Sequence, residues 1–491
     1  MNCGENMEKS IQSKMSNSLK WSTTAEVAAK IITPITNMIL ARLLTPEAFG
    51  VVATVTMVIS IADMFSDSGF QKYLVQHEFD TESGLRESAN VAFTSNIVLS
   101  LILWALICLF DEEIASLVGN PGLGIVIAVA GISLPVTSFS SIQAAIFRRK
   151  FNYKVLCFAR IIAAAIPLII TVPLAIVGWS YWSIIIGTIC GHLTTAVILT
   201  VKSDWKPKIH FSIDEFEQLF SFSMWSLLES IGTWLSSYIG TFIVGGLLSQ
   251  YYLGLYKTTM TTVNGIFAII TSATTTVLFS SLSRLQNNRK EYDDTYTNFI
   301  GTVSIVIIPL GIGIYVYREL VTQILLGSQW TEAVPFVGIY GLMCCFTLVL
   351  GQYASEYFRG LGKPKANVLM TILHLVALIP ALLFGANHGF LTLAYARSLV
   401  KIEQVLVFWA IMWIGFKFNP LVLLKKIIKP LISGLVMGAV GYILLNIHKG
   451  MIMQVVSVVI CIFTYFLFYI YILKGKKDIV SIFRMFTGKN Y

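Results

Sequence analysis

The chain alternates between long apolar blocks and short polar segments over nearly its whole length. Many blocks reach about 20 residues, the length at which a helix crosses the hydrocarbon core of a bilayer. The pattern therefore predicts an all-α polytopic membrane protein with about 14 transmembrane helices. The predicted spans are 17–40, 46–69, 90–110, 122–143, 156–177, 179–200, 218–242, 251–281, 296–317, 334–357, 366–386, 389–414, 427–446 and 451–473.

The composition supports this interpretation. Hydrophobic residues make up 56% and charged residues 12% of the 491 residues, whereas a typical soluble domain is about 25% charged. A soluble protein needs charged side chains on its surface, so the composition excludes a soluble enzyme, a disordered chain and a fibrous repeat. The 7 cysteines have no spacing typical of metal binding or of a disulfide framework, and we predict no metal ion and no cofactor.

Basic residues indicate how the predicted spans are oriented. When the N-terminus is placed inside, most of the 35 lysine and arginine residues fall in inner loops, and only Arg42, Arg318 and Lys449 fall in outer loops. Basic residues near span ends favour the cytoplasmic side of a membrane. We therefore predict that both termini are cytoplasmic and that the basic loops contact anionic headgroups of membrane lipids.

An internal repeat relates the two halves of the chain. Its first span maps onto the seventh, so the two copies point the same way, as in carriers that place a substrate between two lobes. We predict two parallel six-helix lobes, 1–201 and 202–415, followed by a C-terminal helix pair and a cytoplasmic tail in 416–491. The repeat rests on Trp21, Ser22, Leu43, Leu44 and Gly50, which recur at one spacing as Trp225, Ser226, Leu247, Leu248 and Gly254.

Two basic residues near the middle of the twelfth span, Arg397 and Lys401, are the first candidates for a binding site. They lie one helical turn apart on one face, where like charges repel. Charges within a membrane are costly and usually face the interior of the helix bundle or an aqueous cavity. An anionic ligand would relieve the repulsion through charge-assisted hydrogen bonds.

Further charges lie in the repeated spans. Glu26 and Lys30 are one turn apart in the first span, Glu229 lies in the seventh and Lys257 in the eighth. On a helix, Glu26 could simply neutralise Lys30, and Lys257 could pair with Glu229 as a structural contact. The alternative is that both lysines face a common cavity between the lobes.

Other polar residues in spans have a more ordinary interpretation. Asp63 and Asp67 lie toward the inner end of the second span, where inner-gate or helix-end roles are favoured over ion binding. His192 and His374 are lone histidines in apolar spans, and core packing with one hydrogen bond is favoured over proton relay. Glu403 is a poor partner for Lys401, because residues two apart on a helix do not face each other.

Four segments of the chain resemble one family of membrane transporters. They are LARLLTPEAFG at 40–50, FRRKF at 147–151, GLY at 254–256 and RGLGKP at 359–364. Their order and spacing are similar to those of the polysaccharide (Wzx-type) flippases of the multidrug/oligosaccharidyl-lipid/polysaccharide exporter superfamily. The colanic-acid and teichuronic-acid exporter branch is the most similar.

The resemblance implies a V-shaped carrier in a bacterial cytoplasmic membrane. Such a carrier flips an undecaprenyl-pyrophosphate oligosaccharide from the inner to the outer leaflet for surface polysaccharide or lipopolysaccharide biosynthesis. It has a cationic cavity built from spans 1, 2, 7 and 8 and can work beside a polysaccharide polymerase. No nucleic-acid partner is expected.

We expect four basic residues to hold the anionic headgroup and two acidic residues to assist them. Lys30 and Lys257 are assigned by their helix and depth in the resembled fold, whereas Arg397 and Lys401 are assigned from this sequence. Glu26 and Glu229 would tune the lysines or carry a coupling proton or sodium ion.

Three other functions remain as alternatives. An ion-coupled multidrug antiporter of the same superfamily is the main one, although it calls for more mid-span acidic residues than this chain has. A membrane glycosyltransferase or polymerase is disfavoured, because the outer loops are short and contain no glycine-rich phosphate loop or nucleophile motif. The charges within the membrane argue against a non-transport scaffold.

Overall fold

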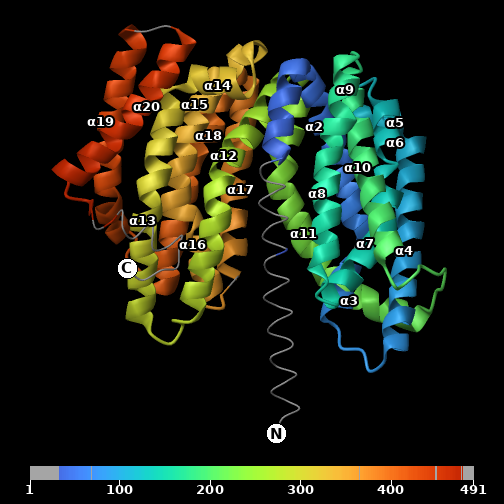
Figure 1. Cartoon of the computed structure of the whole chain (residues 1–491). Helices are drawn as coiled ribbons and strands as arrows, with labels where there is room; N and C mark the ends of the chain where they lie inside the picture. Colours follow the sequence, from blue (N-terminus) through green and yellow to red (C-terminus); the bar gives the residue numbers. More distant parts are fainter. Residues whose placement is uncertain are drawn as a thin grey trace. The chain divides into compact units, whose positions relative to one another are not determined.

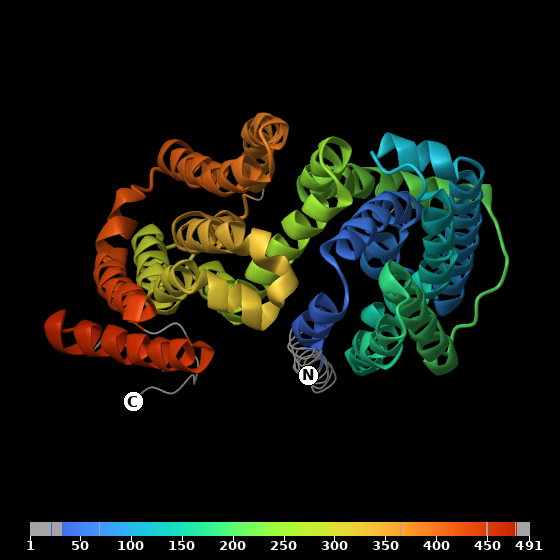
Figure 2. The same cartoon turned by 90° about the horizontal axis from the view of Figure 1, so that it is seen from above.

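The computed structural model describes Trp21 and residues 32–67, 69–363, 365–447, 450–476 and 478. Helices and their connections account for all of these residues, which contain no strand. The chain forms two compact units, Met1–Gly254 and Leu255–Tyr491, called unit 1 and unit 2 below. Views along and across the helices show each unit as a bundle (Figures 1 and 2).

In unit 1, helix α2 packs against α11, α7, α4 and α10. Its core contains fully buried aliphatic residues such as Ile127 and Leu134. A helix over residues 32–43 comes first. The following helices are α2 (Pro46–Asp67), α3 (Phe70–Gln76), α4 (Glu82–Leu109), α5 (Asp111–Leu117), α6 (Gly124–Ala130), α7 (Ser133–Arg149), α8 (Tyr153–Ile169), α9 (Thr171–Ile176), α10 (Ser180–Lys202) and α11 (Ile213–Leu247).

In unit 2, α15 packs between α13 and α18, α19 packs against α13, and α20 packs against α19. Three segments continue their helices as π-helix. The elements are α12 (Gln250–Ser283), of which residues 250–254 belong to unit 1, α13 (Arg289–Val316), α14 (Arg318–Leu325), η1 (Ser328–Ala333), α15 (Val334–Thr347), η2 (Leu348–Gln352), α16 (Ala354–Gly360), α17 (Lys365–Asn387), α18 (Phe390–Ala410), η3 (Ile411–Gly415), α19 (Leu421–Ile447), α20 (Met451–Leu467) and η4 (Phe468–Ile472).

The predicted membrane-spanning character is confirmed. Within the described residues, 12 helices are long and apolar enough to cross a bilayer, and each corresponds to one predicted span. The two further predicted spans are 17–40, which falls largely on residues outside the description, and 218–242, which lies in the 35-residue helix α11. The total of about 14 spans and the division into lobes at 201 and 415 stay predictions.

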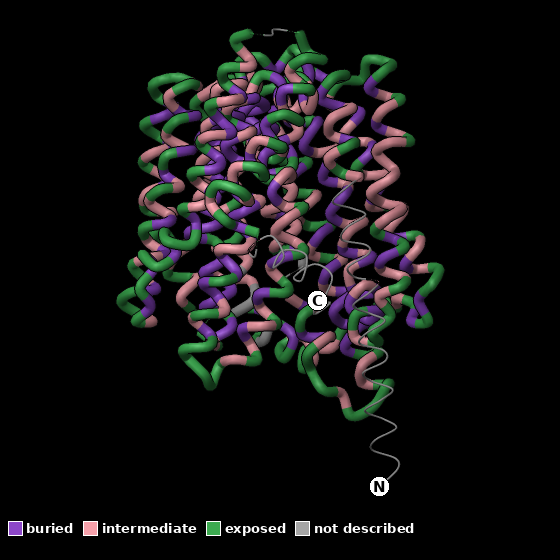
Figure 3. The backbone as a smooth tube through the Cα atoms, turned by 60° about the vertical axis from the view of Figure 1, so that its left-hand side comes forward, coloured by how far each residue is buried: buried purple, intermediate pink, exposed green. Residues whose placement is uncertain are grey.

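The helices carry separate buried and exposed faces. Figure 3 shows buried, intermediate and exposed positions alternating along the tubes. On α17, the exposed residues Val368, Ile372 and Val376 recur every four residues and form an apolar stripe. An exposed stripe of this kind is expected where a helix turns one face to lipid.

Repeated glycines allow two helices to touch backbone to backbone. A side chain at Gly50 would overlap the carbonyl oxygen of Gln250, and one at Gly254 would overlap that of Pro46. Pro46 and Gln250 occupy equivalent positions of the repeat predicted from the sequence, as do Gly50 and Gly254. The contact is therefore reciprocal, and neither glycine position has room for a side chain.

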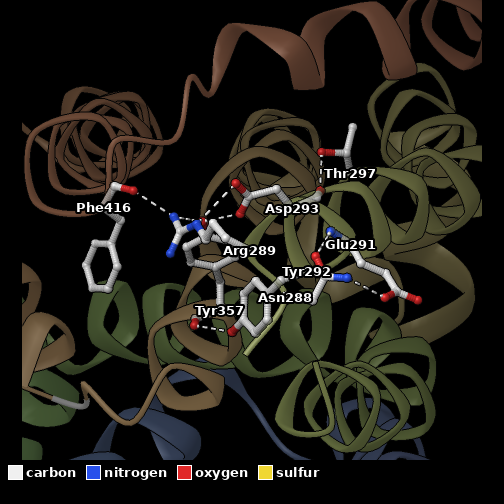
Figure 4. A network of polar contacts seen from close by, with 8 residues as sticks. All are labelled: Asn288, Arg289, Glu291, Tyr292, Asp293, Thr297, Tyr357 and Phe416. Carbon is white, nitrogen blue, oxygen red and sulfur yellow. Dashed lines mark hydrogen bonds and ion pairs between the residues drawn. The ribbon is translucent and has the colours of Figure 1, made fainter. Parts of the chain in front are cut away.

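A polar network fastens the start of α13 in unit 2 (Figure 4). Arg289 donates to the Asp293 carboxylate at 3.2 Å, to the Phe416 carbonyl at 2.6 Å and to the Tyr357 hydroxyl. The Tyr357 hydroxyl in turn donates to Asp293 at 2.6 Å, and Tyr292 donates to the Tyr357 carbonyl at 2.6 Å. These contacts join α13, α16 and the residue that follows η3.

Candidate substrate site

The structure describes the side chains of three of the six predicted site residues. Lys257 lies on α12, and Arg397 and Lys401 lie on α18, all within unit 2. Glu26 and Lys30 lie outside the described residues, and so does the side chain of Glu229 on α11. The described part of the candidate site therefore consists of the three basic residues of unit 2.

Arg397 and Lys401 converge on one aromatic ring. The guanidinium carbon of Arg397 lies 5.8 Å from the ring centroid of Tyr340, and the Lys401 ammonium nitrogen lies 4.9 Å from it. Tyr340 belongs to α15, which packs directly against α18. The negative face of the ring attracts both cations and holds them together despite their mutual repulsion.

Tyrosine, asparagine and cysteine side chains complete the surroundings of the two cations. Arg397 lies next to Tyr256 near the start of α12, and Lys401 lies next to Cys344 on α15, each pair close enough to interact electrostatically. The Tyr340 hydroxyl donates to Asn264 Oδ1 at 3.4 Å, and Cys344 Sγ lies 3.7 Å from the same oxygen. Three helices, α12, α15 and α18, therefore form one polar cluster in an apolar bundle.

Lys257 adds a third positive charge to this cluster. It follows Tyr256 on α12 and is close enough to Arg397 for the two charges to repel each other. Arg397 also repels Lys401. Arg397 is thus repelled by two other half-buried cations, Lys257 and Lys401, within a single unit.

No carboxylate of the described residues neutralises Arg397 or Lys401. The acidic residue nearest in sequence, Glu403, lies 2.9 Å from Nδ1 of His374 on α17. Within the described part of the chain, Nε and Nη1 of Arg397 are shut off from solvent and have no hydrogen-bond partner. Because buried charges in proteins are normally paired, these unused donors indicate room for an anionic ligand.

Several residues of the cluster could not be found from the sequence. Tyr256, Tyr340 and Cys344 lie in apolar spans, where aromatic and cysteine residues are ordinary core residues. The contact between His374 and Glu403 could not be predicted from the sequence either, because the two residues lie on neighbouring helices, α17 and α18. The expectation of one hydrogen bond for His374 agrees with the structure.

Sequence comparison connects the chain to proteins of polysaccharide biosynthesis. A family described as "Polysaccharide biosynthesis protein" matches residues 39–335. Succinoglycan biosynthesis transport protein ExoT of Rhizobium meliloti is 24% identical over 442 residues, covering 88% of this chain and 86% of ExoT. Lipopolysaccharide biosynthesis protein WzxC of Escherichia coli is 20% identical over 371 residues, covering 74% of this chain and 70% of WzxC.

Structural comparison places the fold among known transporters. The structure is similar to lipid II flippase MurJ in an inward closed conformation, with a TM-score of 0.76 and 15% sequence identity. The match covers 93% of this chain and 99% of the MurJ chain. At this identity the likeness concerns the fold alone.

Proposed function

Because the chain belongs to the family of polysaccharide biosynthesis proteins, which are membrane transporters and not enzymes, we propose that it flips a lipid-linked oligosaccharide. The substrate would be an undecaprenyl-pyrophosphate repeat unit that crosses the bacterial cytoplasmic membrane for surface polysaccharide or lipopolysaccharide biosynthesis. The names of the relatives ExoT and WzxC support the biosynthetic process. The observation that carries the proposal is the pair Arg397 and Lys401, whose charges no described carboxylate balances.

The proposed chemistry follows from the headgroup. Pyrophosphate offers several anionic oxygens, and a guanidinium fork binds two of them at once. Lys401 and Lys257 would add point charges, and the Asn264 amide and nearby hydroxyl groups suit the sugar hydroxyls. The polyprenyl tail would stay in lipid while alternating access moves only the polar headgroup.

Other parts of the proposal concern the remaining predicted residues. Lys30 would contribute to the same cationic cavity, and Glu26 and Glu229 would tune the lysines or carry a coupling ion. Both termini would be cytoplasmic, and the transporter would move its substrate between two six-helix lobes. A polysaccharide polymerase would take up the exported unit.

The test is glycan export in cells that lack this gene. Complementation would use the wild type, the double variant Arg397→Ala/Lys401→Ala and the control Lys425→Ala, which changes an exposed lysine on α19. We expect lipid-linked oligosaccharide to accumulate in the inner leaflet, to be exported by the wild type and the control, and to remain trapped with the double variant. Membrane levels of each protein would be compared.

The other outcomes of this experiment separate the alternatives. If the double variant is present at normal levels and exports fully, the flippase proposal stands, but Arg397 and Lys401 do not bind the headgroup. Altered drug sensitivity without trapped oligosaccharide would overturn the proposal in favour of the multidrug antiporter.

A further inference from the structure

Unit 1 has an apolar groove of about 470 Å³ where α7 and α10 pack side by side. Pro135, Val136 and Phe139 of α7 form one wall, and apolar residues of α10 form the other. The α10 residues Val197 and Val201 are 60% and 69% exposed, so the groove opens on the surface of the bundle. Among the described residues that line it, only Thr200 has a polar side chain.

The groove has the length of one leaflet and not of a whole bilayer. It follows α10 from Leu193 to Val201, which is about 12 Å at the rise of a helix. Half of the hydrocarbon core of a bilayer is about 15 Å thick. A single lipid chain therefore suits the groove better than a membrane-spanning helix of another protein does.

Polar groups lie at one end of the groove, at the C-terminus of α10. The Thr200 hydroxyl and the Gln143 amide are hydrogen-bonded at 3.0 Å, which joins α10 to α7. Lys206 Nζ donates to the Thr200 carbonyl at 2.5 Å, so its ammonium group lies beside the last residues of the apolar lining. An ammonium group has three donors, and two of them remain for an anion.

Buried residues hold Lys206 in this place. Its neighbour Trp205 is buried and packs edge-to-face on Phe93, with ring centroids 6.1 Å apart. Phe93 in turn packs on Phe139 of the groove wall, with ring centroids 5.5 Å apart. The Ser203 hydroxyl also donates to the Trp205 carbonyl at 2.8 Å. The segment with Lys206 and the wall of the groove thus share one aromatic cluster, which fixes the ammonium group relative to the apolar lining.

This end of the groove has a positive charge without an acidic partner. Lys202 in the last turn of α10 and Lys206 are both exposed, and neither forms an ion pair with a described residue. The acidic residue between them, Asp204, lies 4.0 Å from Lys150 Nζ instead. Lysines at the end of a membrane-spanning helix attract acidic lipids. The phosphate of such a lipid would supply the missing negative charge.

We propose that the groove between α7 and α10 binds an acidic phospholipid. One acyl chain lies along Phe139, Leu193 and Val197, and the phosphate contacts Lys202 and Lys206. The lipid comes from the leaflet on the side of these two lysines and stays beside unit 1, so it is not the transported substrate. The proposal therefore goes beyond the function proposed above and does not depend on it.

Photocrosslinking of the purified full-length protein in phosphatidylcholine nanodiscs tests this site. The probe is phosphatidylglycerol with a diazirine in one acyl chain, and mass spectrometry locates the crosslinked residues. We expect crosslinks in 135–139 and 193–201 to be several-fold more frequent than on the apolar stripe of α17. Unlabelled phosphatidylglycerol should suppress them, whereas additional phosphatidylcholine should not.

Variants separate the two parts of the site. Val197→Trp should fill the groove and reduce the crosslinks several-fold. Val368→Trp on α17 is its matched control, because the two valines are 60% and 59% exposed. Lys202→Gln/Lys206→Gln should reduce the preference for phosphatidylglycerol over phosphatidylcholine by about fivefold for each lysine. Lys425→Gln on α19 is the control for the loss of positive charge.

Three results would overturn the proposal. Equal crosslinking of the groove and the α17 stripe would mean that the groove selects no lipid, and an unchanged preference in the lysine variant would exclude the phosphate contact. Displacement of the probe by undecaprenyl phosphate but not by phosphatidylglycerol would assign the groove to the tail of a polyprenyl lipid. The first comparison uses the wild type, so it does not depend on whether a variant folds. No transport is measured, so failure of this site and failure of the proposed flippase are distinguishable.

Discussion

At the residue scale, the central feature is a pair of cations held by an aromatic ring. Arg397 and Lys401 could be predicted, because two like charges one turn apart are rare in an apolar span. Their partners Tyr340 and Tyr256 could not, since aromatic residues in such spans usually belong to the core. The contact of both cations with one ring depends on the packing of α15 against α18, which no local pattern encodes.

Replacing Arg397 should weaken binding of a pyrophosphate lipid. Arg397→Gln removes a charge-assisted interaction of about 1.5–3 kcal/mol, which corresponds to about ten- to a hundredfold in affinity. Arg397→Lys keeps the charge but loses the fork, and we expect an intermediate loss. Binding of undecaprenyl pyrophosphate to the purified variants measures this, with Lys425→Gln as control. Unchanged affinity in both Arg397 variants would exclude a direct contact.

Glu403 should stabilise unit 2 through His374. Glu403→Leu leaves the half-buried imidazole without its partner at 2.9 Å, whereas Glu403→Gln can still accept a hydrogen bond. We expect a lower midpoint of thermal unfolding for Glu403→Leu than for Glu403→Gln in the same detergent. Equal midpoints would mean that the contact contributes little to stability.

At the element scale, the sequence predicts where helices cross the membrane better than how they continue outside it. The lengths of the apolar blocks are enough to predict the 12 candidate spans found among the described residues. The predicted span 122–143 forms two helices, α6 and α7, and α7 continues to Arg149. There Arg149 donates to the carbonyls of Leu74 and His77 at 2.9 and 2.6 Å. A hydropathy pattern contains no information on such contacts or on the π-helical segments.

The glycine contact between α2 and α12 should be essential for folding. Gly254→Val would force a side chain into the Pro46 carbonyl and separate the two backbones. We expect little folded protein in the membrane by size-exclusion chromatography of a fluorescent fusion. Gly265→Val on the same helix is the control, because nothing lies within 4 Å of its added Cβ. A normal profile for Gly254→Val would show that the backbones can move apart at little cost.

At the scale of the whole molecule, the chain is a multi-pass membrane transporter for polysaccharide biosynthesis. In unit 2, Arg397 and Lys401 lie over the ring of Tyr340, and Lys257 is close enough to Arg397 for their charges to repel each other. In unit 1, Asp63 lines a pocket together with Thr137 and His192. The sequence predicted Arg397 and Lys401 as a binding site and favoured an inner-gate or helix-end role over ion binding for Asp63, and both statements stay predictions.

The basic loops predict the orientation of the whole molecule in the membrane. A fluorescent protein fused after residue 491 should fluoresce, and alkaline phosphatase fused near Arg318 should be active, because the first needs the cytoplasm and the second the outer side. The reverse pattern would contradict the orientation on which the direction of transport is based.

The central claim is that this protein moves a lipid-linked oligosaccharide between leaflets. The most direct measurement reconstitutes the purified protein into liposomes with an undecaprenyl-pyrophosphate oligosaccharide and follows its accessibility to a sugar-modifying enzyme added outside. Without protein, about half of the lipid should stay protected, since the polar headgroup cannot cross hydrocarbon. We predict that the wild type exposes this protected pool and that Arg397→Ala/Lys401→Ala exposes it much more slowly. A protected pool that the folded wild type leaves unchanged would contradict the account.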